Sequence, residues 1–510
     1  GKDDKSKDNG KTAGKDKDTN KVRQPSLAER IALRPLMMVR KARFTYSENY
    51  SSVVPGFTPE PRLMGLSEGF TAPGWGFILG LQPTEDWLDR AAANGWMTHR
   101  PELVQQVTRN FTQNIDANVT LEPFRDFRIE VTATKQFTRN GTELFKDQNF
   151  SLNPDDVDFQ HRALRDMGSF TVSYFAMNTL FNNDIDGLFA RFKDNRPIIS
   201  ERLGIIAGNT GQHTTDLDYA FGYGRIHQEV LAPAFIAAYT NQDANTVELD
   251  LFKARPALNW KLTYNGLTKV GNIGKRFSNI QLTHGYKSAL TVNSYNTDIF
   301  YDRANPYVVD ELNFNYIARF EIPQVLINEQ FTPLLGLSMK TKAGMNFDVD
   351  FKRSRQLAMS FVDYQLAETR STSYNIGFGY RMRDVNIPFL TGKKSKKKKS
   401  AKTKKPDPNA PPAPPSPAGI SGQQPNDMNF IFAFEVRDDI TVNLRLDQLE
   451  EAIPTRGFRT VTLNPAIEYA LNRRLKLRLF TDYRRTIPKT SQSFPITTLR
   501  SGVTMQFSLN

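Results

Sequence analysis

Residues 111–134 read FTQNIDANVTLEPFRDFRIEVTAT, and this stretch decides the fold class. Apolar side chains occupy almost every second position on both sides of a short turn at 122–126, which contains Pro123. Because successive side chains of a strand point to opposite faces, each half has one apolar and one strongly polar face. The stretch therefore predicts an antiparallel hairpin.

The same period-two alternation recurs along most of the chain and predicts roughly 14–17 strands of about 8–14 residues. It is found at 258–264, 280–286, 335–352, 374–383, 430–446, 461–483 and 502–509. We expect a tight turn at Asp438-Asp439 within the fifth of these stretches. Helix is predicted to be a minority, at Thr84–Trp96 and more weakly at Asn183–Lys193, Pro197–Leu203 and Ile226–Tyr239.

Two low-complexity segments divide the chain. Residues 1–24 mix Lys, Asp and Gly, and residues 392–427 contain a lysine run followed by a proline-rich stretch. Neither has enough apolar surface to fold, so both are predicted to be flexible. The remaining divisions are 25–391, with strands and two long inserts at about 51–105 and 176–245, and 428–510, with the C-terminal strands.

Charge and composition exclude several classes of protein. The net charge of +13 would suit a nucleic-acid partner, but much of it lies in the nine Lys of 392–427, not on a folded face. We therefore expect no nucleic-acid binding. The chain has no Cys, which excludes disulfides and thiolate metal sites. No apolar run approaches the roughly 18–20 residues that a transmembrane helix needs.

The alternate positions of each strand differ strongly in polarity: one set is apolar and the other is strongly polar. This contrast favours a transmembrane β-barrel, because such a sheet separates lipid from a water-filled lumen. Its predicted fold class is all-β with minor helical inserts. The loops at 392–427, 448–457 and 486–495 are long while other turns are tight, as in outer-membrane barrels. With the C-terminus in the periplasm, we expect the turns at 438–439 and 472–474 on the periplasmic side and the Lys/Pro-rich loop outside. We expect the two inserts to reach into the lumen or the periplasm, where their helices narrow or support the pore. A soluble β-sandwich with long loops is the alternative that alternation alone leaves open.

The alternation also assigns individual residues to the lumen side or the lipid side of the predicted barrel wall. The candidates for the lumen side are polar: Asn114, Asp116, Asn118, Glu130, Asn346, Asp348, Asp350 and Arg381. The candidates for the lipid side are apolar: Phe127, Ile129, Phe347, Phe351, Phe430, Phe432, Phe434, Val503, Met505 and Phe507. In this interpretation the function lies in the wall of the pore and not in a reactive site.

No catalytic, cofactor or metal site is predicted. The five His residues show no metal-binding spacing, and adjacent carboxylates such as Asp155-Asp156 and Glu450-Glu451 lie in predicted turns or loops. The sequence contains no G-x-S-x-G motif. We therefore expect the protein not to be an enzyme.

Several long segments resemble the SprA/Sov family, the outer-membrane translocon of the type nine secretion system in Bacteroidetes. They are LMMVRKARFTYSE (Leu36–Glu48), PGWGFILG (Pro73–Gly80), IPQVLINEQFTPLLGLSMK (Ile322–Lys340), SRQLAMSFVDYQLAETRS (Ser354–Ser371) and LNPAIEYALNRRLKLRLFTDY (Leu463–Tyr483). The resemblance runs from about residue 36 to the end of the chain. The two low-complexity segments depart from it.

The resemblance implies that the chain is the C-terminal arc of a giant antiparallel transmembrane β-barrel, whose other strands precede it. It implies passage of folded proteins across the bacterial outer membrane to the cell surface, linked to gliding motility in some members. The implied partners are the rest of the same barrel, membrane lipid, secreted cargo, a small PorV-like barrel and a periplasmic plug. The alternative function is a smaller, self-contained porin or uptake receptor.

Overall fold

The computed structural model describes residues 37–100, 102–149, 157–209, 211–213, 216–385, 387, 427–446, 454–471, 474–490 and 493–508. The predicted charged segment at 1–24 lies outside these residues, as does the Lys/Pro-rich segment at 392–427 except for its last residue.

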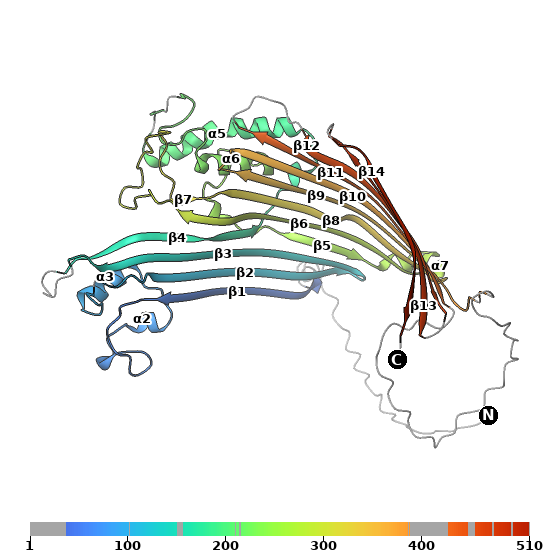
Figure 1. Cartoon of the computed structure of the whole chain (residues 1–510), viewed down its shortest axis with the longest axis horizontal. Helices are drawn as coiled ribbons and strands as arrows, with labels where there is room; N and C mark the ends of the chain where they lie inside the picture. Colours follow the sequence, from blue (N-terminus) through green and yellow to red (C-terminus); the bar gives the residue numbers. More distant parts are fainter. Residues whose placement is uncertain are drawn as a thin grey trace, which may run out of the picture.

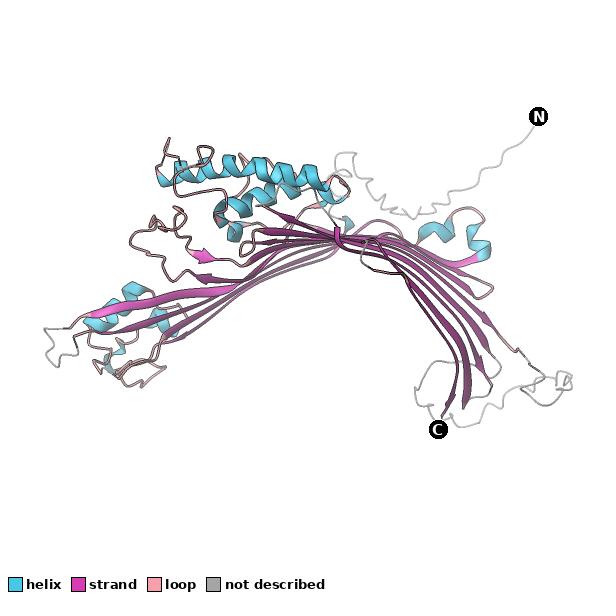
Figure 2. Ribbon diagram, turned by 45° about the horizontal axis from the view of Figure 1, so that its top comes forward, coloured by secondary structure: helices cyan, strands magenta, loops and turns pink. Residues whose placement is uncertain are grey.

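The described residues form one antiparallel sheet of 14 strands, arched across its width (Figures 1 and 2). Its main path is β1-β2-β3-β4-β6-β8-β9-β10-β11-β12-β13-β14, so neighbours in sequence are mostly neighbours in space. The strands are β1 (Val39–Val53), β2 (Val107–Phe124), β3 (Phe127–Asp147), β4 (Phe159–Ser173), β5 (Asn259–Tyr264), β6 (Phe277–Thr297), β7 (Phe320–Glu321), β8 (Gln324–Thr341), β9 (Met345–Ser360), β10 (Gln365–Met382), β11 (Met428–Arg445), β12 (Pro454–Ala470), β13 (Leu475–Pro488) and β14 (Ile496–Phe507). The predicted all-β class with minor helix is confirmed at this level.

The strand β11 corrects one prediction. It runs without a break through Asp438 and Asp439, which pair with Thr372 and Ser371 of β10. The two acids are therefore in the middle of a strand, because β10 and β12 supply backbone partners along its length. As a consequence, Met382 and Met428, which flank the Lys/Pro-rich segment, lie at the same end of the sheet as the turn after Ala470. The predicted placement of that segment and that turn at opposite ends is wrong.

The strands β4 and β5 lie end to end between β3 and β6. Residues 127–132 of β3 pair with β5 and residues 135–147 pair with β4. Likewise, residues 282–286 of β6 pair with β5 and residues 289–296 pair with β4. Residues 174–258 therefore leave and re-enter one strand position of the sheet, and we call them the insert. A second excursion, residues 54–106, joins β1 to β2. Figure 1 places the helices of both at the same end of the strands, away from α7 (Ile273–Arg276).

The helices are α2 (Trp75–Ile78), α3 (Glu85–Ala93), α4 (Met177–Leu180), α5 (Ile185–Ala207), α6 (Gln228–Thr240) and α7, with short 3-10 turns at Glu68–Phe70, Leu251–Lys253 and Gly266–Lys269. Helix α3 begins as predicted, because the Thr84 side chain accepts a bond from the Trp87 N–H. The two helices predicted at 183–203 are one helix. Pro197 cannot donate to the Lys193 carbonyl, and the Arg196 Nε donates to that carbonyl instead, at 3.4 Å.

No helix within the described residues is long and apolar enough to cross a membrane.

Candidate functional site: the two faces of the sheet

The strand register divides the sheet into two chemically different faces. Directly opposed residues of antiparallel strands share a face, so the phase can be followed from strand to strand. On one face Val349 lies between Leu337 and Ile376, which in turn lies opposite Phe434. On the other face Asp348 lies between Ser338 and Gly377. We call these the apolar face and the polar face.

All ten apolar candidates lie on the apolar face, and all eight polar candidates lie on the polar face. Phe347 and Phe351 of β9 are on the same face as Phe430, Phe432 and Phe434 of β11, through their shared partners on β10. The register carries this face on to β14, where Val503, Met505 and Phe507 oppose Leu479, Leu477 and Leu475. In the other direction it reaches Ile129 and Phe127 of β3. Asn114, Asp116, Asn118 and Glu130 lie opposite, with Asn346, Asp348, Asp350 and Arg381.

The apolar face carries an exposed band near the end of the sheet that contains the 342–344 turn. Its exposed members are Leu335, Val349, Tyr374, Ile376, Phe432, Leu479, Val503, Met505 and Phe507. A continuous exposed apolar patch of this extent marks a surface that contacts lipid or another protein. On β11 the band runs from Met428 to Val436, close to the roughly 9–11 residues that a tilted transmembrane strand needs.

The band ends at a row of charged side chains on the same face. Arg353, Asp438 and Arg459 stand at one level, because Thr372 opposes both Arg353 and Asp438, and Asp438 opposes Arg459. Arg485 lies one pleat nearer the band, opposite Val461. Beyond this row the apolar face is covered from β4 to β11, where the insert packs on it.

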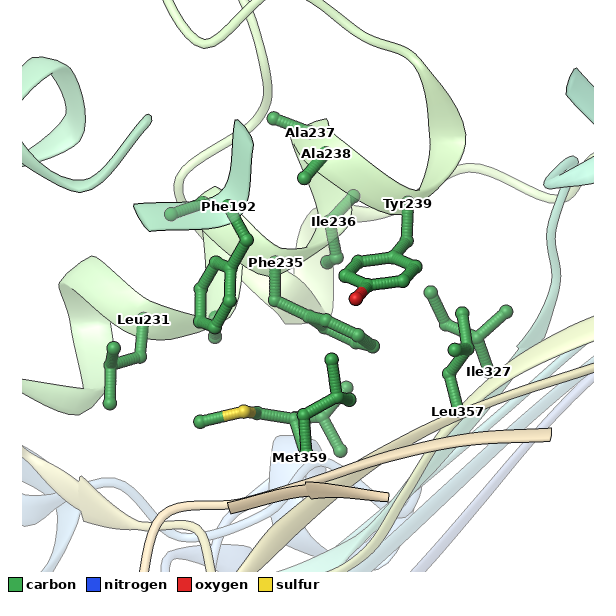
Figure 3. Close-up of a cluster of buried hydrophobic side chains, with 14 of the residues drawn as sticks. Phe192, Leu231, Phe235, Ile236, Ala237, Ala238, Tyr239, Ile327, Leu357 and Met359 are labelled. Carbon is green, nitrogen blue, oxygen red and sulfur yellow. The ribbon is translucent and has the colours of Figure 1, made fainter. Parts of the chain in front are cut away.

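The insert forms the main hydrophobic core with this covered part of the apolar face. Phe235 and Tyr239 of α6 and Phe192 of α5 pack above Ile327, Leu357 and Met359 of the sheet (Figure 3). The helix α6 is buried on nearly every side. Each fully buried Leu, Ile, Met or Phe contributes about 1.5–3 kcal/mol relative to exposure, so this core holds the insert firmly.

A buried polar network fastens the insert to the strands β8 and β9 at the level of the charged row. Arg355 of β9 bonds Glu329 of β8, and neither side chain is exposed at all. The same guanidinium donates to the Thr179 carbonyl at 2.9 Å and to the Thr179 hydroxyl at 2.7 Å. Next to it Arg353 donates to the Leu180 carbonyl at 3.1 Å and lies over the Phe181 ring. These bonds join α4 of the insert to the sheet.

Residues 176–245 pack on the apolar face, and the prediction that they reach into the lumen or the periplasm stays a prediction. The core of the insert lies on the apolar face, the face opposite Asp348 and Asp350. Residues 54–106 also pack on the apolar face. Leu88 and Ala91 of α3 pack there with Val107 of β2 and Phe145 of β3. The physical reason is that both helices need an apolar surface for their buried side, and only this face offers one.

The polar face is hollowed across β6 to β12. A hollow of about 780 Å³ is lined there by Lys287, Gln356, Thr369, Arg437 and Arg456, among others. Most of its side chains are hydrophilic, and they include the cations Lys287, Arg437 and Arg456, with Phe458 among the few apolar ones. Such a surface holds water well and offers no apolar pocket for a small organic ligand.

The described residues include no group of three or more His, Asp or Glu that is placed to hold a metal. His161 lies between Glu143 and Asp89, at 2.7 and 3.1 Å, and links α3 to the sheet. His284 shares the apolar face with Tyr286 and bonds the Leu334 carbonyl at 2.6 Å. His227 caps α6, where burial lowers its pKa. Sequence reasoning missed the Glu329–Arg355 network, since nothing in the sequence links Thr179 to Arg355.

Comparison with protein-family models and with curated proteins found no match to this chain.

Proposed function

We propose that this chain forms an arc of the wall of a very large outer-membrane β-barrel, and that the barrel conducts proteins to the cell surface. The apolar face would contact lipid and the polar face would line a water-filled lumen. In this proposal the protein acts through the shape and chemistry of its wall. It is a translocon of the type that the SprA/Sov resemblance implies, with export of folded cargo and a link to gliding motility.

The observation that carries the proposal is the exposed apolar band, which has similar height on neighbouring strands and a polar, hollowed surface behind it. Transmembrane barrels carry an outward apolar band about 25 Å tall, with lumen-facing polar residues in the alternate positions. A soluble sandwich would bury its apolar face against a second sheet. Here Val349, Ile376 and Val503 remain exposed, and the part of this face beyond the charged row is covered by the insert.

The two edge strands support a barrel larger than this sheet. Within the described residues β1 pairs only with β2 and β14 only with β13, and the two edges are not paired with each other. Lipid cannot satisfy their free backbone groups, each of which costs several kcal/mol. The proposal supplies further strands of the same barrel as partners. A smaller self-contained porin or receptor would need β1 to meet β14.

The resembling segments fall on elements that build the wall and its covering. They cover β1, part of the 54–106 excursion, β8, the β9–β10 hairpin and the β12–β13 hairpin. The PorV-like barrel, the periplasmic plug and the secreted cargo enter as partners only through this resemblance. The proposal places none of them on particular residues.

The absence of Cys from the chain allows a direct test. Single Cys residues are introduced at adjacent positions of β9, as Asp348→Cys on the polar face and Val349→Cys on the apolar face. The full-length protein is then labelled in outer membranes with a charged maleimide and with a lipophilic one. We expect the charged reagent to label position 348 and the lipophilic reagent to label position 349.

A second pair, Asn375→Cys and Ile376→Cys on β10, serves as a replicate with the same alternation. Equal labelling of both members of each pair by the charged reagent would contradict the proposal, because both faces would then be in water. Recovery of the protein in the soluble fraction would contradict it as well.

A further inference from the structure

A cluster of cations lies on the apolar face directly beyond the exposed band, on β12, on β13 and just after β13. It consists of Arg459, Arg485 and Lys489, and we call it the basic cluster. Arg459 opposes Ile487, so Arg485 and Lys489 lie one pleat to either side of it on the same face. All three residues are exposed. The cluster lies to the side of the insert, whose buried core reaches β11 and includes no residue of β12 or β13.

The basic cluster has more positive charge than its surroundings neutralise. Asp438 is its one carboxylate partner within the part of the chain that the structure describes, and it accepts a bond from Arg459 Nη2 at 3.1 Å and another from Lys489. Lys489 reaches Asp438 across Gly457, where an added Cβ would lie 3.2 Å from the Lys489 Cβ. Arg485 has no carboxylate partner among the described residues. Three cations therefore share one acid, and two positive charges remain.

The surroundings of the cluster decide which kind of anion it suits. On the band side, Arg485 opposes Val461, and the next residues on this face are Leu463 and Tyr483. Below them come Ile467 and Leu479, which continue the exposed band. A ligand that uses both surfaces needs a strongly anionic head and apolar chains attached to it. Arg suits a phosphate head because its planar guanidinium donates two parallel hydrogen bonds.

We propose that Arg459, Arg485 and Lys489 bind the phosphate headgroup of an anionic membrane lipid, whose acyl chains lie along Val461, Leu463 and Leu479. This inference rests on the proposed function, since it needs the band to be in lipid. The basic cluster would then be a specific lipid-binding site on a surface that elsewhere contacts lipid non-specifically. A lipid held here would cover the apolar face beside the insert, where no described helix packs on β12 or β13.

The test uses the full-length protein in phosphatidylcholine nanodiscs that contain either bis-phosphorylated lipid A or phosphatidylglycerol. The variant is Arg459→Gln/Arg485→Gln/Lys489→Gln. The matched control is Arg456→Gln/Arg484→Gln/Lys476→Gln, which removes two Arg and one Lys from the polar face of the same two strands. Bound lipid is counted by native mass spectrometry after release from the discs.

We expect the triple variant to retain phosphorylated lipid on the order of a hundredfold more weakly, and the control to retain it like the wild type. Loss of lipid A alone, or of phosphatidylglycerol alone, supports the site and identifies the source of the phosphate. Unchanged retention of both lipids in the triple variant overturns the inference.

Two measurements separate this inference from its premise. The single substitution Arg485→Gln breaks no ion pair among the described residues, so several-fold weaker lipid retention by this variant reports a lost lipid contact and not a folding defect. Unchanged retention counts against the site. If the wild type itself fails to enter nanodiscs, the proposed function fails. If it enters and the triple variant holds the same lipids, only the lipid site fails.

Discussion

Glu329 and Arg355 face each other across β8 and β9 with both side chains fully buried, and they bond to each other beneath α4. The pair lies on the apolar face, where neighbours on the same two strands are Ile327 and Leu357. Arg355 also bonds Thr179, so one guanidinium connects the sheet to the start of the insert. The apolar face thus changes from an exposed band to a covered core at this ion pair and at the charged row beside it.

Removal of one member of this pair should loosen the insert. Arg355→Met leaves Glu329 buried without its cation, which typically costs about 3–5 kcal/mol. We expect limited proteolysis to cleave α5 and α6 much faster in this variant. The double variant Glu329→Gln/Arg355→Met should recover most of the protection, because no charge then remains buried. If the double variant is cleaved as fast as the single one, the pair does not hold the insert by charge.

The effect of an introduced charge should depend on which face of the sheet carries it. Phe432→Arg places a cation on the apolar face in the middle of the band, which costs about 2–4 kcal/mol at the midplane of a bilayer. Its neighbour Ile431→Arg places the same residue on the polar face. We expect Phe432→Arg to lower the yield of protein folded in lipid vesicles, measured by heat-modifiable migration, and Ile431→Arg to leave it near wild type. Equal effects would argue against lipid on the apolar face.

The start of α6 should depend on pH. His227 Nδ1 accepts the Glu229 N–H at 3.3 Å, and Nε2 bonds the Tyr316 carbonyl at 3.0 Å. Burial lowers the pKa of His227, while Glu229 and the Tyr316 carbonyl oppose this shift. A lowered folded-state pKa means that its contribution to stability is complete above the unfolded-state pKa of about 6.5. That contribution falls as the pH drops from there towards the folded-state pKa.

We therefore expect hydrogen exchange in α6 to speed up between pH 7 and pH 5, after correction for the intrinsic rate. His227→Asn keeps an acceptor for the cap and removes the titration, so its corrected exchange should change less over the same range. An equal pH dependence in both proteins would assign the effect to a titrating group other than His227.

The glycine at position 168 should be hard to replace. An added Cβ there would lie 1.9 Å from the Thr138 carbonyl oxygen, which also accepts the Tyr295 hydroxyl at 2.9 Å. Gly168→Ala must therefore move β4 away from β3, and overpacking of this kind costs about 1–3 kcal/mol. Gly377→Ala on β10 is the control, since its Cβ would meet Asp348 at an ordinary 3.5 Å. Thermal unfolding of the two variants measures the difference.

The sequence by itself determined the faces of the strands that it predicted and the start of α3. Alternation assigns Asp348 and Val349 to opposite faces whatever the neighbouring strands are, because the side-chain period of a strand is fixed at two. Thr84 and the acids after it predict the start of α3 from local hydrogen bonding alone. These features depend on residues that are close together in the chain.

Only the tertiary structure decided which elements share a surface. Asp438 and Asp439 have turn propensity, but β10 and β12 supply partners on both sides and keep β11 straight. Pro197 suggests a break in α5, but burial of Ile199 and Leu203 keeps the helix whole. The covering of the apolar face by the insert, and the bond from Thr179 to Arg355, join residues far apart in the chain. Local pattern carries no information on such contacts, because they arise from burying apolar area and charge when distant segments meet.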